Sequence, residues 1–210
     1  MKGIFITIEG PDGSGKTTAT QHLVQELQAR GYKVLFTREP GGNKIAEQIR
    51  DVLHSRSNTE MDKRTEALLY AAQRRQHLIE TIIPALKDGY IVISDRYIDS
   101  SLAYQGYARG IGIDEVLQVN LFATEGLLPN YTIYFDVSAE EGLARIQKNP
   151  NREVNRLDAE KLEFHQKVHQ GYLELLKKYP ERIKKIDASK DEAQVYQEHK
   201  QVVFDILGIK

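Results

Sequence analysis

The sequence predicts an α/β fold in which a five-stranded parallel sheet carries helices on both faces. Short runs rich in β-branched and aromatic residues recur along the chain, and segments with helical periodicity separate them. Strands that alternate with helices form β-α-β units, whose right-handed crossovers place helices on both sides of the sheet. The 210 residues are enough for one domain with a buried core, so we expect a single domain over residues 1–210.

The first predicted strand covers residues 4–8, and a glycine-rich turn and a helical pattern follow it. The other strands are predicted at residues 33–37, 90–94, 131–137 and 182–187. Apolar residues at helical spacing predict helices over residues 44–54, 66–83, 157–178 and 195–206. Ser138 and Glu141 form a capping-box pattern that predicts the start of another helix. Pro84 is expected to break its helix before Gly89.

The composition narrows the class of protein. With 29 basic and 30 acidic residues, the net charge of −1 implies no surface for nucleic acid. The absence of cysteine excludes a disulfide framework and a thiolate metal site. No apolar run approaches the ~20 residues of a membrane span, and no leader precedes the first strand. We therefore expect a cytoplasmic protein without a membrane partner.

The turn after the first strand fits the phosphate-binding pattern G-x-x-x-x-G-K-[ST]. A strand before it and a helix after it are the context typical of a P-loop NTPase. Glycines let several backbone N–H groups face one anion, Lys16 can reach the terminal phosphates, and the Thr17 hydroxyl can ligate Mg²⁺. ATP and Mg²⁺ are thus the expected cofactors. The expected ATP-binding residues are Gly10, Pro11, Asp12, Gly13, Ser14, Gly15, Lys16, Thr17 and Thr18.

Two further strand ends carry charged residues that suit phosphate chemistry. Asp95 ends the third strand, where its carboxylate can hold the water shell of Mg²⁺, and Arg96 can bind phosphate oxygens as a bidentate fork. Arg38 follows the second strand, in a turn that Pro40 and two glycines hold open. The structural alternatives are a surface ion pair for Asp95 and Arg96 and a solvated side chain for Arg38. The shared sheet edge favours a common phosphate site.

Tyr70 and Arg74 are four residues apart on a predicted helix and share one face. An aromatic ring and a planar donor suit a nucleobase, although a structural cation–π pair is the commoner fate of this spacing. A GTPase switch is disfavoured, because Asp95 begins no Asp-x-x-Gly turn. His165 and His169 have a spacing that can bind metal, but no glutamate lies between them, and we interpret them as surface residues.

Three segments together resemble the bacterial thymidylate kinase family. They are the phosphate loop Gly-Pro-Asp-Gly-Ser-Gly-Lys-Thr-Thr, the turn Thr-Arg-Glu-Pro-Gly-Gly, and the run Asp-Arg-Tyr-Ile-Asp-Ser-Ser-Leu-Ala-Tyr-Gln-Gly from residue 95. The last of these is the most specific. The resemblance implies transfer of the ATP γ-phosphoryl group to dTMP, which yields dTDP and feeds dTTP synthesis. It also implies a homodimer, through helix faces such as 66–83 and 114–122, and a short mobile lid at about residues 145–157.

The resemblance also implies roles at the phosphate and sugar of dTMP. Arg38 and Arg96 would clamp the 5′ phosphate, with Arg50 in support. Asp12 would hold the 3′ hydroxyl and help to set the arginines. Glu39 would lie near the sugar and the metal.

At the base, the resemblance implies a stacking position for Tyr70, where the family usually has phenylalanine. Arg74 would hydrogen-bond the thymine edge, and Ser101 and Gln105 would read its N3 side. Tyr104 would crowd the C2′ atom of the sugar and select deoxyribose.

The phosphate loop has no arginine at positions 11–14, which matches the family type whose lid supplies the catalytic arginine. The expected lid offers Arg145, Lys148, Arg152 and Arg156, of which Arg152 and Arg145 are the leading candidates. A guanidinium that arrives with closure stabilises the charge of the moving phosphoryl group. The expected catalytic residues are Lys16, Asp12, Arg96, Arg152 and Arg145, with Thr17 and Asp95 at the metal.

Two other functions stay open from the sequence. A kinase for another nucleoside monophosphate or for a deoxynucleoside would keep the phosphate loop and change the base pocket. A deoxynucleoside acceptor would also need a general base, and the arginine clamp would have nothing to hold. A non-enzymatic nucleotide switch would bind nucleotide without turnover that an acceptor stimulates.

Overall fold

The computed structural model describes residues 2–148 and 156–209. Its sheet is parallel and has the strand order β2-β3-β1-β4-β5, as predicted in number and type of strand. The strands are β1 (Ile4–Glu9), β2 (Val34–Arg38), β3 (Ile91–Asp95), β4 (Tyr131–Asp136) and β5 (Ile183–Asp187). Each bound lies within one residue of its prediction, because β-branched and aromatic runs fit a sheet that is covered on both faces.

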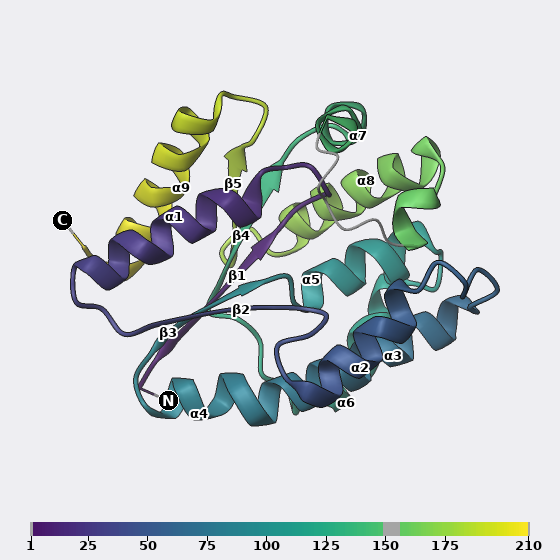
Figure 1. Ribbon diagram of the computed structural model, residues 1–210, viewed down its shortest axis with the longest axis horizontal. Helices are drawn as coiled ribbons and strands as arrows, with labels where there is room; N and C mark the ends of the chain where they lie inside the picture. The colour runs from purple at the N-terminus through teal and green to yellow at the C-terminus, as the bar shows by residue number, and fades with distance from the viewer. Residues whose placement is uncertain (1, 149–155, 210) are drawn as a thin grey trace.

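Helices cover both faces of this sheet (Figure 1). The described helical segments, with η for π- and 3-10 turns, are α1 (Lys16–Ala29), α2 (Lys44–His54), α3 (Lys63–His77), η1 (Leu78–Ile82), α4 (Ile83–Lys87), α5 (Ile98–Ser101), η2 (Leu102–Ala108), α6 (Ile113–Thr124), α7 (Ala139–Gln147), η3 (Arg156–Ala159), α8 (Leu162–Lys178) and α9 (Glu192–Leu207). Among them, no helix combines the length and the apolarity that a membrane crossing needs.

Two buried hydrophobic clusters lie on opposite sides of the sheet. Alternation along β1 sends Phe5 into one cluster and Ile6 and Ile8 into the other. The Ile6 cluster joins the sheet to α1 and α9, through side chains such as Leu23. The Phe5 cluster joins it to η1, α4, η2, α6 and α8. The sheet is thus the middle layer of three, and its carboxyl edge stays open for ligands.

Three local predictions need correction. The helix predicted from residue 157 begins at Leu162, and Leu157 belongs to a separate 3-10 turn. Pro84 does not break its helix, because a π-helical turn precedes it, with the Ile83 N–H bonded to the Leu78 carbonyl five residues back. His165 is buried beside Phe164 and is not a surface residue, whereas partly exposed His169 bonds to Asp136 at 2.8 Å.

Candidate active site

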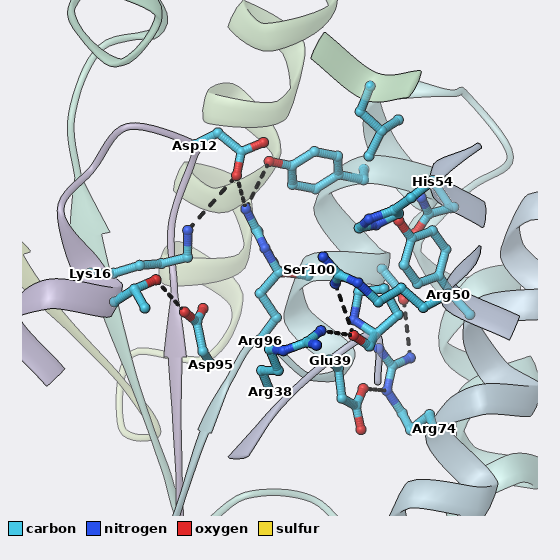
Figure 2. Close-up of a pocket in the computed structure, with 17 residues that line it drawn as sticks. Asp12, Lys16, Arg38, Glu39, Arg50, His54, Arg74, Asp95, Arg96 and Ser100 are labelled. Atoms are coloured by element: carbon cyan, nitrogen blue, oxygen red, sulfur yellow. Dashed lines mark hydrogen bonds and ion pairs between the residues drawn. The ribbon is translucent and has the colours of Figure 1, made fainter. Parts of the chain in front are cut away.

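A cavity of about 460 Å³ opens at the carboxyl edge of the sheet, and Figure 2 shows the side chains that reach it. Strand register explains part of the convergence, since Asp95 pairs with Ile8 of β1 and with Arg38 of β2. The cavity is lined from the phosphate loop, the ends of β2 and β3, and the helices α2, α3, α5, η2 and η3. The lining residues include Asp12, Lys16, Thr17, Arg38, Glu39, Arg50, Tyr70, Arg74, Asp95, Arg96, Ser101, Tyr104, Gln105 and Leu157.

The phosphate loop has the backbone that its glycines allow. Gly13 and Gly15 have φ values of 79° and 78°, which side chains rarely adopt. A Cβ at Gly13 would overlap the backbone carbonyl of Gly142 in the first turn of α7. Gly15 caps α1, so the start of that helix directs N–H groups and the positive end of its dipole at the loop.

Lys16 lies almost fully buried beside the loop carboxylate, with its Nζ 3.9 Å from Asp12 Oδ1. Desolvation and the nearby Arg96 charge lower its pKa, and the carboxylates of Asp95 and Asp12 oppose that shift. The lysine therefore faces the cavity as a cation without water around it. Such a charge is worth more to a bound phosphate than one in solvent.

The expected metal site has oxygen donors only. Thr17 Oγ1 donates a hydrogen bond to Asp95 Oδ2 at 2.5 Å. Within residues 2–148 and 156–209, no cluster of three acidic or histidine side chains is arranged to cage an ion. This donor set suits Mg²⁺, which keeps several waters and takes its other ligands from substrate phosphates.

Arg96 has a left-handed backbone with φ 72°, a costly conformation for a residue with a side chain. It directs the guanidinium along the cavity, where Nη2 binds Asp12 Oδ1 at 2.6 Å and Nη1 binds Ser100 Oγ at 3.0 Å (Figure 2). Tyr172 and Tyr104 hydroxyls lie 3.3 and 3.4 Å from the same two nitrogens. The forked group is thus held before any anion binds.

Arg38 and Arg50 reach the same region from β2 and α2, and both donate to the Pro40 carbonyl, at 2.9 and 3.1 Å (Figure 2). Arg38 also pairs with Glu47 at 3.0 Å, in a contact that is largely exposed. With Lys16 of α1 and with Arg96 in the turn after β3, these residues bring four cations to one cavity.

Arg74 lies at the opposite end of the cavity and is 1 % exposed. Its Nε donates to Glu39 Oε2 at 2.7 Å and its Nη2 to the Tyr97 carbonyl at 2.9 Å. Its Nη1 donates to Ser101 Oγ at 3.0 Å and to Asn120 Oδ1. These contacts with described residues use four of the five N–H groups of the guanidinium.

Glu39 is part of this buried network and also lines the cavity. Its Oε1 lies 3.0 Å from His77 Nδ1, and its Oε2 accepts the hydrogen bond from Arg74 Nε. Burial opposes its negative charge, but the Arg74 cation and the contacts with His77 together outweigh that effect and lower the pKa of Glu39. The sequence did not reveal His77, Asn120 or the Tyr97 carbonyl as partners. Their contacts join positions far apart in the chain.

The base-reading residues expected from the sequence line the cavity together. Tyr70 and Tyr104 are buried, and desolvation raises the pKa of both hydroxyls, so they remain neutral donors. Gln105 is 2 % exposed and donates from Nε2 to Glu66 Oε1 at 2.8 Å. Glu66 was missed in the sequence, where its only signal is that it lies one turn before Tyr70 on the same helix face.

The expected lid arginines have separate surroundings. Arg145 lines a second cavity, of about 470 Å³, with the loop residues Gly13, Ser14, Gly15 and Thr18. Its guanidinium donates to the Ala188 carbonyl at 2.8 Å and pairs with Glu141 at 2.6 Å.

Two other lid arginines were named from the sequence. Arg156 donates to the Leu53 carbonyl at 3.2 Å and forms an ion pair with Glu66. Arg152 lies outside the described residues.

The two cavities thus meet at the phosphate loop, from which Asp12, Lys16 and Thr17 line the first. The first cavity is rich in arginine and is also lined by the aromatic rings of Tyr70 and Tyr104, and the second cavity is lined by Arg145 and Lys190. The arrangement can hold two anionic ligands with their charged ends at one loop, which is the geometry that phosphoryl transfer needs.

Comparison with known proteins gives a consistent result. The family model for thymidylate kinase matches residues 8–199. A thymidylate kinase of Clostridium novyi is 59 % identical over 199 residues, which are 95 % of this chain and 97 % of the relative. One of Bacillus velezensis is 58 % identical over 207 residues, 99 % and 98 % of the two chains. The crystal structure of thymidylate kinase from Ehrlichia chaffeensis has a TM-score of 0.77 at 33 % identity and covers 97 % of this chain and 99 % of its own.

Proposed function

Because this chain belongs to the thymidylate kinase family, we propose that its two cavities hold the two nucleotides of one phosphoryl transfer. The chain phosphorylates dTMP to dTDP with ATP and acts in nucleotide biosynthesis. The assignment of individual residues to this reaction is our proposal, within one domain of residues 1–210 and a lid at about 145–157.

The first cavity, which contains Arg38, Arg50 and Arg96, is the proposed dTMP site. Its arginine-rich end receives the 5′ phosphate, which Arg38 and Arg96 clamp with support from Arg50. Asp12 holds the 3′ hydroxyl and fixes Arg96, to which it is already bonded at 2.6 Å. The Tyr104 hydroxyl lies 3.4 Å from Arg96, so its ring lies beside the sugar and excludes a 2′ hydroxyl.

The aromatic end of this cavity takes the base. Tyr70 offers a ring for stacking, and the remaining N–H of Arg74 faces an acceptor on the thymine edge. Ser101 accepts from Arg74 at 3.0 Å and keeps that guanidinium in place. Gln105 lines the same end and reads N3.

The second cavity is the proposed adenosine site. The ATP phosphates lie over the backbone N–H groups of the loop, from Gly13 to Thr18, and Arg145 contacts the nucleoside. We therefore assign Arg145 to binding ATP. Arg152 is the lid arginine that we assign to the transferred phosphoryl group.

The reaction needs little chemistry from the protein beyond position and charge. An oxygen of the dTMP phosphate attacks the γ-phosphorus in line and forms the new P–O bond. The bond from that phosphorus to the β–γ bridging oxygen breaks, and ADP leaves with the electron pair. The acceptor is ionised at neutral pH, so no strong general base is required. Lys16, Arg96 and Arg38 neutralise the charge that gathers between the two phosphates.

Mg²⁺ fits the oxygen donors at the end of β3. The Thr17 hydroxyl would ligate it, and the Asp95 carboxylate, 2.5 Å from that hydroxyl, would hold its water shell. The bound ion supplies charge neutralisation on the ATP phosphates.

The convergence of Lys16, Arg38, Arg50 and Arg96 on one cavity is the observation that carries this proposal. It is tested by ADP release with Mg-ATP and a panel of dTMP, dUMP, dCMP, dGMP, AMP, UMP and thymidine. We expect strong turnover with dTMP, weaker turnover with dUMP and little with the rest. Turnover with thymidine would contradict the phosphate clamp, and preference for another monophosphate would contradict the base pocket. A Lys16→Met variant should lose turnover and retain the fold, whereas a nucleotide switch would show no turnover in either protein.

We also propose a homodimer through α3, η1 and α6. Leu68, Ile79 and Phe122 on these elements are 57 %, 42 % and 88 % exposed, which is unusual for large apolar side chains on neighbouring helices. A second copy of the chain would cover them. Sedimentation at micromolar concentration should give the mass of two chains, and a mass of one chain would contradict the proposal.

A further inference from the structure

Glu66 is a buried carboxylate that none of the roles above uses. It lies in the first turn of α3 and is 1 % exposed. Its Oε1 accepts from Gln105 Nε2 at 2.8 Å and from Arg109 Nε at 3.3 Å. Its Oε2 accepts from Arg109 Nη2 at 3.2 Å and from Arg156. One oxygen thus serves a residue of the base pocket, and the other lies between two guanidinium groups.

These cations keep Glu66 ionised despite its burial. Desolvation opposes the charge, but Arg109 and Arg156 and the bond from Gln105 outweigh it and lower the pKa of Glu66. An ionised carboxylate only accepts hydrogen bonds. The group of Gln105 that faces Glu66 must therefore be its NH₂ end. The carbonyl oxygen of Gln105 is therefore the end of the amide that is left for the cavity.

We propose that Glu66 is the positioning residue for base selection, because it turns the Gln105 carbonyl toward the base and so favours pyrimidines that carry N3–H. Thymine and uracil have a hydrogen on N3, which a carbonyl oxygen accepts. Cytosine has a bare N3 that would oppose the same oxygen. The inference rests on the proposed seat of the base beside Gln105.

A carbonyl aimed at N3 discriminates strongly only if it cannot turn around. An amide that is free to rotate offers its NH₂ to cytosine and its oxygen to thymine, and it selects neither. Gln105 cannot rotate without directing its oxygen at the Glu66 carboxylate, at a distance where two acceptors repel. The charge on Glu66 is therefore the source of the selection.

Glu66→Gln tests the proposal sharply. The two arginines would retain the oxygen of the new amide, and its NH₂ would then face Gln105. Gln105 would turn its oxygen to that NH₂ and present its own NH₂ to the base. Substrates for the assay are dTMP, 5-methyl-dCMP and dUMP. The first two differ only at the N3–C4 edge, and dUMP lacks only the methyl group of dTMP.

We expect Glu66→Gln to lower the ratio of kcat/KM for dTMP over 5-methyl-dCMP at least about tenfold. The ratio for dTMP over dUMP should change less than about twofold, because both bases carry N3–H. A loosened pocket would move both ratios together and would overturn the proposal. Glu66→Asp keeps the charge for the arginines and shortens the reach to Gln105, so it should lower the first ratio as well. If Glu66→Gln does not fold, the Glu66→Asp variant tests the proposal in its place.

Two matched variants separate the inference from the function on which it rests. Glu160→Gln removes the other carboxylate that binds Arg109, at 2.6 Å, and leaves Glu66 with both arginines and with its bond to Gln105, so both ratios should stay as in the unmodified protein. Gln105→Leu removes the amide itself and should lower the first ratio. If Gln105→Leu lowers it and neither Glu66 variant does, Gln105 reads the base without Glu66 and the inference is wrong. If Gln105→Leu leaves the ratio unchanged, the proposed seat of the base is wrong too.

Discussion

Asp12 and Arg96 are 84 residues apart in the sequence, and their side chains form an ion pair of 2.6 Å in the lining of the proposed dTMP cavity. The first comes from the phosphate loop after β1 and the second from the strained end of β3. Lys16 lies 3.9 Å from the same carboxylate oxygen. The loop proposed for the donor phosphates is thus tied directly to a residue of the proposed acceptor clamp.

Asp12→Ala should reduce kcat/KM for dTMP by about 10²-fold, because Arg96 loses the carboxylate that holds its fork and the sugar loses a partner. KM for ATP should change far less. Steady-state kinetics with each nucleotide varied in turn measure this split. Glu125→Ala is the control, since it removes an exposed ion pair with Arg75 and should leave both constants unchanged. Equal losses for ATP and dTMP would contradict the assignment.

Glu9 should make stability depend on pH. Burial, together with the Asp99 charge, raises its pKa from 4.5 to about 7. The folded protein therefore holds a proton that the unfolded chain releases above pH 4.5, and stability falls as the pH rises from 4.5 to about 7. Over this window the loss approaches about 3 kcal/mol.

A Glu9→Gln variant carries no titrating group at this position. Its free energy of unfolding, measured by urea denaturation at pH 5, 6, 7 and 8, should rise relative to that of the unmodified protein as the pH increases. Parallel curves across this range would contradict the raised pKa. Tyr97 N–H donates a hydrogen bond to Glu9 Oε1 at 2.7 Å, and the side-chain carbonyl oxygen of the Glu9→Gln variant can accept the same bond.

Arg156→Ala should raise KM for dTMP about tenfold and change KM for ATP less than about twofold. The reason is that Arg156 binds Glu66 and the Leu53 carbonyl and holds Leu157 against the dTMP cavity. Steady-state kinetics with dTMP and ATP varied in turn measure the two KM values. A fall in kcat with unchanged KM would instead assign Arg156 to the transferred phosphoryl group.

Gly13→Ala should destabilise the protein by at least about 2 kcal/mol, from an unfavourable φ and from overlap with the Gly142 carbonyl. Gly126→Ala is the matched control, because its φ of 75° is nearly the same as the 79° of Gly13 and a Cβ there meets nothing within 4 Å. It should cost about 1 kcal/mol. Urea denaturation of both variants measures the difference, and equal costs would show that the contact with Gly142 contributes nothing.

The sheet could be predicted because its signal is local. Runs such as Ile91–Asp95 are apolar, short and bounded by turn residues, so their identity as buried strands depends on few distant contacts. The helix after Arg96 could not be predicted in this way. Leu102–Ala108 is a π-helical segment whose residues face both the core and the cavity, and its sequence has no single apolar stripe.

The site residues were predictable where a motif fixed them and not where tertiary contacts did. Thr17 and Asp95 follow from the ends of two strands, which the fold brings together. The partners of Arg74 come from the turns after β2 and β3 and from α5 and α6, and Asn120 carries no signal in the sequence. Arg156, which the sequence placed in the expected lid, is buried against Glu66, a partner that the sequence did not reveal. A charged side chain in a polar segment gives no indication of the carboxylate that will bind it.

The contacts of Arg74 also imply that the two ends of the proposed dTMP cavity differ in how far they are formed before substrate binds. Four N–H groups of this guanidinium are bonded to buried described residues, so the base end has its shape before a nucleotide arrives and loses little conformational entropy on binding. Arg38 at the other end is largely exposed and bound to Glu47, which it must release to grip a phosphate. If the proposed assignment holds, the base enters a site that is already formed, whereas the phosphate replaces Glu47 as the partner of Arg38, and only the second step should weaken markedly with rising salt.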